Sequence, residues 1–277
     1  MKFAEKIQYI KSVKKSLYIL KDRKRYEDFV KKSDYNADLV KSPVCIKDKY
    51  RNYPDKAERE PINTSVKNVA SFYEMHRLLL KKYRLKEIAS ADNDFDNALL
   101  ILKWLTENTF YCGIQMHKTK DDSRDILEFS FNKPFSKAIN CRLKAIVLSD
   151  CLVAVGIKAY PVCMVSGDFS GCHFTCRVYI RELKKWCAFD TSVGCWFSDE
   201  NNNPMDIYEI RELFLQNKEP KVHEYNFNGT TNCLDAYMNG FLKYCISNLT
   251  TWQDNSMSGR NSKKFKSRKK FNAKLPI

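Results

Sequence analysis

The sequence predicts an α+β fold in which an antiparallel sheet packs against a central helix. The first observation is an almost continuous apolar segment at 141–155, which is typical of a helix surrounded by protein. The second is a set of three β-type segments that follow it within hairpin distance, at 158–165, 172–180 and 184–190. The third is the helical spacing of apolar residues on both sides of this region, which predicts additional helices toward both ends of the chain.

The composition is that of a folded protein rather than a disordered one. Of the 277 residues, 44% are hydrophobic and 13% are aromatic, which is ample for a packed core. No segment approaches the roughly 18 consecutive apolar residues of a membrane span. The first residues scatter lysines among apolar positions, unlike the apolar block of a signal peptide. We therefore expect a cytoplasmic protein without a membrane span.

The chain contains 11 cysteines and no C-x-x-C pair. In a cytosolic protein most of them are expected to be reduced and buried as small hydrophobic residues. Structural zinc sites use closely spaced cysteine pairs, which are missing here. We therefore expect neither a metal nor a cofactor.

Charge and periodicity divide the chain into three predicted parts. Residues 1–62 read as a basic amphipathic helix followed by an irregular linker, and residues 63–250 read as the core. Residues 251–277 form a basic tail, in which Arg260 to Lys274 hold 8 basic residues and no acids. The net charge of +15 permits an anionic partner for this tail, with Phe265 and Phe271 as stacking groups. A solvated tail is the alternative.

Upstream of the central segment, two helices are predicted at 63–85 and from about Phe95 to Phe110, the second capped by Asp94 or Asp96. Trp104 lies beside the apolar face of this second helix. The alternation of apolar and polar residues at 126–131 predicts a short strand.

Downstream of the central segment, Asp206 is placed to cap a helix that contains Ile207, Ile210 and Phe214. A further helix is predicted at 233–249, with His223 in the loop between the two.

The start of the central helix is where chemistry is expected. Cys141 would lie in the first turn, where unpaired backbone N–H groups and the helix dipole favour an anion. A thiolate in such a place is a nucleophile for carbonyl carbon. The backbone N–H of Cys141 is also placed to stabilise the oxyanion that this attack creates.

His173 and Asp190 are the expected partners of this thiol. A hairpin that turns at Arg181-Glu182 would oppose Ile180 to Leu183, and the same register would oppose His173 to Asp190 on one face of the sheet. A cysteine, a base and an acid in this order favour a catalytic triad, although each residue alone is more often structural. The other three histidines are weaker candidates: His76, His117 and His223.

The segment resembles the core of the transglutaminase-like superfamily, a branch of the papain-like enzymes with a cysteine nucleophile. The resemblance rests on Cys141 opening a helix, Gly156-Ile157 turning into a strand, His173 beginning the next strand, and Trp186-x-x-x-Asp190 closing the third. It extends over about residues 98–194. It implies an antiparallel sheet packed on the helix of the nucleophile, with Cys141 as nucleophile, His173 as base and Asp190 as the orienting acid.

The resemblance also implies a second oxyanion donor upstream of the cysteine, for which Gln115 and Tyr111 are the candidates. The expected chemistry is acyl transfer on peptide or protein amide bonds. Hydrolysis is favoured because water needs no second binding site, and protein cross-linking is the alternative. A catalytically silent peptide-binding module, or a binder of anionic polymers through the basic tail, is the alternative from another class.

Overall fold

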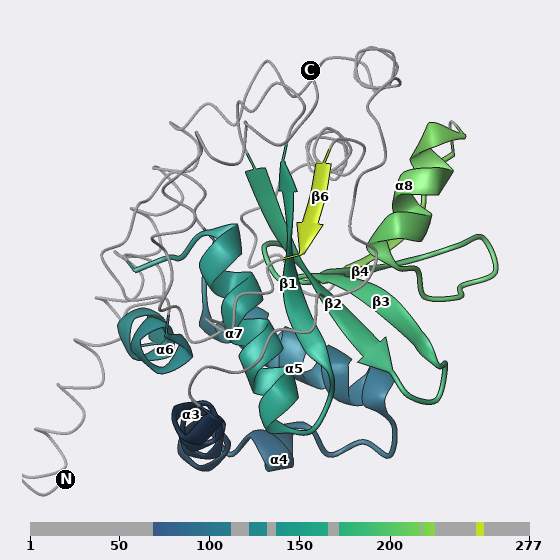
Figure 1. The fold of residues 1–277 in the computed structure, drawn as a ribbon. Coiled ribbons are helices and arrows are strands. Elements are labelled where there is room, and N and C mark those ends of the chain that lie inside the picture. The colour runs from purple at the N-terminus through teal and green to yellow at the C-terminus, as the bar shows by residue number, and fades with distance from the viewer. Residues whose placement is uncertain are drawn as a thin grey trace, which may run out of the picture.

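The framework of the molecule is an antiparallel sheet, which Figure 1 shows together with the helices around it. The structure is a computed structural model that describes residues 69–111, 122–131, 137–165, 172–216, 218–224 and 248–251. Within these ranges six strands form one sheet in the order β5-β4-β3-β2-β1-β6. Their bounds are β1 Ala159–Val165, β2 Cys172–Ile180, β3 Lys185–Asp190, β4 Cys195–Ser198, β5 Lys221–Glu224 and β6 Asn248–Thr251.

The helices lie on both sides of this sheet. In the described part of the chain they are α3 Val69–Tyr83, α4 Leu85–Ile88, α5 Asp94–Asn108, α6 Ser123–Phe131, α7 Cys141–Ala154 and α8 Ile207–Leu215. Helix α7 crosses β1 and β2, and α3, α5 and α6 surround it (Figure 1). Helix α8 lies on the opposite side, where it packs against a second, separate cluster of buried apolar residues. The mixture of helices and antiparallel sheet confirms the predicted α+β class.

The central helix is as the sequence predicts. It begins at Cys141, and the Asn140 side chain caps it by accepting a hydrogen bond of 3.0 Å from the Leu143 N–H. The helix ends before Gly156, whose φ of 91° is in the left-handed region that favours glycine. Every residue from Leu143 to Leu152 is buried, which explains why the segment lacks a polar face.

The two faces of the sheet follow the alternation of side chains along each strand. On β3, Cys187 and Phe189 belong to the core beneath α7, whereas Ala188 belongs to the core beneath α8. On the α8 side, Asp206 forms a capping box with Glu209 and binds the buried Arg177 of β2, so the predicted cap is confirmed. The same residue thus starts α8 and ties it to the sheet.

The β2–β3 hairpin has a longer turn than predicted. Residues 181–184 form the turn, and Ile180 lies opposite Lys185 rather than Leu183. The predicted register, with His173 directly opposite Asp190, is therefore wrong by two residues. Lys184 closes the turn with a φ of 52°, which a sequence pattern rarely predicts for a lysine.

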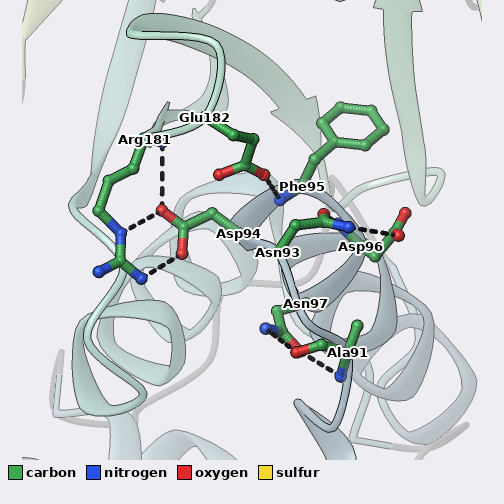
Figure 2. Close-up of polar contacts among 8 residues, drawn as sticks. All are labelled: Ala91, Asn93, Asp94, Phe95, Asp96, Asn97, Arg181 and Glu182. Atoms are coloured by element: carbon green, nitrogen blue, oxygen red, sulfur yellow. Dashed lines mark hydrogen bonds and ion pairs between the residues drawn. The ribbon is translucent and has the colours of Figure 1, made fainter.

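The turn is held by the start of α5, as Figure 2 shows. Arg181 donates two hydrogen bonds of 2.6 Å from its guanidinium to the Asp94 carboxylate. Glu182 accepts a hydrogen bond of 2.8 Å from the Phe95 backbone N–H. The Asp94 side chain thus binds the hairpin turn instead of capping α5. The N-cap of α5 is Asn93, not Asp94 or Asp96 as predicted.

Three other predicted elements differ in the structure. The predicted strand at 126–131 is helix α6, because its buried residues recur with helical spacing: Ser123, Ile126, Leu127 and Ser130. His223 lies in strand β5, not in a loop. Asn248 and Leu249, placed at the end of a predicted helix, lie in strand β6.

The rest of that predicted helix, the basic segment at 1–62 and the tail from Arg260 to Lys274 lie outside the described residues. In the part of the chain that is described, no helix is long and apolar enough to cross a membrane.

Candidate active site

Cys141 differs in exposure from the five other cysteines whose side chains the structure describes. It is half-buried at the first turn of α7, whereas these five are buried: Cys151, Cys163, Cys176, Cys187 and Cys195. Its side chain packs beside a small apolar cluster of Ala145, Cys163 and Phe174. The thiol with the greatest access to solvent in this set is therefore the one at the helix N-terminus, where unpaired N–H groups favour an anion.

His173 and Asp190 form a short contact at the adjoining strand ends. The Nε2 atom of His173 lies 2.6 Å from Oδ2 of Asp190. Asp190 is fully buried, and its second oxygen accepts a hydrogen bond of 2.7 Å from the Ser192 backbone N–H. These contacts fix the position of the carboxylate that holds the imidazole. Because Nε2 is engaged, Nδ1 is the nitrogen that remains for another partner.

The imidazole also contacts Cys141. Burial alone would lower the pKa of His173, but the charge and hydrogen bond of Asp190, and then a hydrogen bond with the Cys141 side chain, raise it well above its ordinary value of 6.5. A cationic imidazole next to a thiol favours the thiolate–imidazolium pair. The structure therefore brings together the three residues that the sequence singled out.

The even size of the register error explains why these residues still meet. Side chains alternate between faces with a period of two, so a shift of two residues leaves each of them on its original face. His173 and Asp190 are diagonal rather than direct neighbours across the β2–β3 ladder. Thr175, two residues after His173 on β2, donates a hydrogen bond of 2.8 Å to the Phe189 carbonyl of β3. This hydrogen bond fixes the two strands to each other.

Lys144 is a residue near this site that sequence reasoning missed. Its side chain is buried, with 1% of its surface exposed, and Nζ donates a hydrogen bond of 2.8 Å to the Thr109 carbonyl. Burial lowers the pKa of Lys144 to about 7, although the Asp190 charge acts in the opposite direction. The available signal was a lysine inside a mostly apolar helix, one turn after the cysteine.

The two candidates for a second oxyanion donor have different outcomes. Tyr111 forms a parallel bridge with Ile139, and the Ile139 N–H donates a 2.8 Å hydrogen bond to the Phe110 carbonyl. The segment after α5 thus runs beside the residues that lead into Cys141. Gln115 lies outside the described residues.

A second histidine–aspartate pair lies on the far part of α7. Nε2 of His76 is 3.6 Å from Oδ1 of Asp150, and Oδ2 of Asp150 accepts a 2.6 Å hydrogen bond from Ser123. Both His76 and Asp150 are buried. Here the aspartate, not the histidine, lies between the other two groups, and burial raises the pKa of the adjacent Cys151. The arrangement joins α3, α6 and α7.

The remaining sequence candidates are placed as follows. His223 stacks on Trp196, with ring centroids 3.9 Å apart, and its Nε2 lies 2.8 Å from the Ser198 hydroxyl. His117 lies outside the described residues. Within the described ranges, no group of three His, Cys, Asp or Glu side chains is arranged to hold a metal ion.

Comparisons with known proteins give weak similarities. No protein-family model matches the sequence, and no curated protein matches it significantly. Among solved structures, the chain is similar to a "putative cysteine protease" from Cytophaga hutchinsonii, with 17% identity and a TM-score of 0.33 over 47% of this chain and 43% of that one. It is also similar to a "putative protease" from Parabacteroides distasonis, with 13% identity and a TM-score of 0.30 over 53% and 25% of the two chains.

A third structure, described as a TGase, has 18% identity and a TM-score of 0.27 over 47% of this chain and 34% of that one. The matched part spans less than half of each of these three chains. With TM-scores of 0.33 or lower, these similarities carry no argument about activity, which rests instead on the residues of the site.

Proposed function

We propose that this protein is an acyl-transfer enzyme of transglutaminase-like fold with a cysteine nucleophile, acting on peptide or protein amide bonds. The observation that carries the proposal is the position of His173, which contacts the Cys141 thiol and lies 2.6 Å from the buried Asp190 carboxylate. A thiol, a base and an orienting acid in this sequence of contacts form the arrangement that nucleophilic catalysis requires.

The reaction follows from the roles of the three residues. The Cys141 thiolate attacks the carbonyl carbon of the amide, and the tetrahedral oxyanion is stabilised by the backbone N–H of Cys141. The His173 imidazolium gives its proton to the amine nitrogen as the carbon–nitrogen bond breaks, which leaves a thioester. A water molecule then attacks the thioester, His173 accepts its proton, and the acid product and free thiol are released. Asp190 keeps the imidazole oriented throughout.

Selective alkylation tests whether Cys141 is activated. Iodoacetamide is added to the native full-length protein near pH 6, and modification of each of the 11 cysteines is followed by mass spectrometry. An activated Cys141 should react at least about ten times faster than the other thiols, because they remain protonated. Equal rates for all the cysteines would overturn the proposal. Selective alkylation without turnover of any peptide would instead indicate a peptide-binding module.

Hydrolysis is the proposed outcome of the thioester, and an added amine tests it. A glutamine- or asparagine-containing casein digest is incubated with the enzyme, with and without a small primary amine such as methylamine. Release of ammonia or new N-termini without incorporation of the amine supports hydrolysis. Incorporation of methylamine, abolished by Cys141→Ser, would assign the enzyme to the cross-linking transferases instead.

A further inference from the structure

Lys144 is a buried cation close to the proposed nucleophile. It lies three residues after Cys141 on α7, a spacing that places side chains on the same face of a helix with Cβ atoms about 5–6 Å apart. With 1% of its surface exposed, the Lys144 side chain is removed from water, and a buried charge destabilises the fold strongly unless it is paired and hydrogen-bonded. A leucine or methionine would fill this space at lower cost to the fold.

The contacts of Lys144 link the elements that build the site. Its Nζ donates to the carbonyl of Thr109, the residue that ends α5, two positions before Tyr111. Its charge is attracted by Asp190, the residue that holds His173. The ammonium therefore binds the segment beside the nucleophile and is attracted by the acid of the proposed triad.

We propose that Lys144 is a positioning residue of this site: its buried ammonium favours the thiolate of Cys141 and thereby sets the lower pH limit of the enzyme's reactivity. The inference rests on the proposed function, since it concerns the ionisation of the proposed nucleophile. A positive charge near a thiol stabilises the thiolate over the thiol. It acts most strongly where water is excluded, because the local dielectric constant is low.

The effect is confined to the acid side of the pH profile of alkylation. The pKa of Lys144 is about 7, so the ammonium carries its charge at acidic pH and loses it at higher pH. Charged and titratable residues on the elements around the first turn of α7 include Cys141 and Arg142 on α7 itself, Cys163 on β1, His173 on β2, Asp190 on β3 and Tyr111 after α5.

The test measures the rate of Cys141 alkylation by iodoacetamide from pH 4 to pH 9 in three variants of the full chain. Lys144→Met removes the charge and the hydrogen bond, whereas Lys144→Gln removes the charge and keeps an N–H donor for Thr109. Lys103→Met is the matched control, since it removes the same charge from an exposed position on α5. The reagent is uncharged, so its own reactivity does not follow the charge of the site.

The expected result is that both Lys144 variants move the acid limb of the profile upward by on the order of 0.5–1 pH unit. The Lys103→Met profile should remain where it is in the wild type. A slower Lys144→Met with an unshifted acid limb and a normal Lys144→Gln would mean that the lysine is only a structural anchor, which would overturn the inference. Lack of selectivity for Cys141 in the wild type would overturn the proposed function itself.

A second measurement needs no Lys144 variant. In protein labelled with ¹³C at lysine Cε, the Lys144 signal is recognised by its titration near pH 7. Coupling between two charges is reciprocal, so a thiolate that is stabilised by Lys144 must also stabilise the ammonium. Alkylation of Cys141 removes the thiolate and should lower the titration midpoint of this signal. An unchanged midpoint would contradict the proposal.

Discussion

Asp190 holds His173 through Oδ2 and the Ser192 backbone through Oδ1, so both of its oxygens are engaged while it is fully buried. A carboxylate fixed at both oxygens cannot rotate away from the imidazole. The orientation of His173 toward Cys141 is therefore determined by the β3–β4 turn as well as by β2. This relationship makes Asp190 the position where a small chemical change has the clearest consequence.

Asp190→Asn should reduce Cys141-dependent turnover by about 10²–10⁴-fold, the usual contribution of a positioned acid or base. The carboxylate raises the pKa of His173, so its loss should also lower the pH at which the imidazolium loses the proton it gives to the leaving amine, and the alkaline limb of turnover should move to lower pH. The pH profile of kcat/KM for peptide turnover measures both effects. Asp150→Asn, in the other buried histidine–aspartate pair, is the control and should retain the wild-type profile. An unshifted alkaline limb in Asp190→Asn would exclude the proposed role.

Lys144→Met should stabilise the fold at pH 6 by on the order of 1–3 kcal/mol, after loss of the hydrogen bond to Thr109. The pKa of Lys144 is about 7 in the folded protein and 10.5 ordinarily, so between these values only the unfolded state keeps the proton. Wild-type stability therefore rises with pH across this window, and the destabilisation is complete below it. Urea denaturation at pH 6, 8 and 9.5 should show the advantage of the variant shrinking as pH rises. A less stable variant at pH 6 would contradict this prediction.

Ser123→Ala should destabilise the protein by about 1–3 kcal/mol, because it leaves Oδ2 of the buried Asp150 without its 2.6 Å hydrogen bond. Ser130→Ala is a matched control on the same helix. Ser130 is also fully buried, but its hydroxyl has no hydrogen-bond partner among the described residues. Chemical denaturation of the two variants should therefore give clearly different free energies of unfolding. Equal losses would show that the Ser123–Asp150 contact adds nothing.

Arg177→Met should lower the free energy of unfolding by about 3–5 kcal/mol, because it leaves the Asp206 carboxylate buried without its cation. Burial already raises the pKa of Asp206, even with Arg177 present. The double variant Arg177→Met/Asp206→Asn should be more stable than the single one, since it removes the unpaired charge and asparagine remains a good N-cap for α8. Urea denaturation of both variants measures which of the two is more stable. A double variant less stable than Arg177→Met would contradict it.

The elements that are determined by local sequence signals could be predicted. The nearly continuous apolar segment that starts at Cys141 and the helix cap at Asp206 are local signals, and both are confirmed. Strand β2 has the predicted bounds, Cys172–Ile180, because β-branched and aromatic residues fill it. In contrast, the apolar residues of 126–131 fit neither a helix nor a strand clearly. The segment is a helix because its apolar residues are buried by contacts with α7, which the local sequence does not show.

The register of the β2–β3 hairpin could not be predicted from local pattern. The turn is stabilised by Arg181 and Glu182 binding Asp94 and Phe95, which are 87 residues away in the sequence. It also requires a left-handed Lys184, where a glycine would have been the recognisable signal. Lys144 was missed for a related reason, since a single lysine in an apolar helix does not show whether it faces solvent or the site.

The separation of the site residues in the sequence has a consequence for biosynthesis. Cys141 belongs to a helix, whereas His173 and Asp190 belong to strands that must pair with each other and then pack on that helix. Contacts of this kind form late, because closing the intervening loops costs entropy before the strands are paired. An incompletely folded or newly synthesised chain therefore carries an ordinary thiol, and the proposed reactivity arises only in molecules that have completed folding.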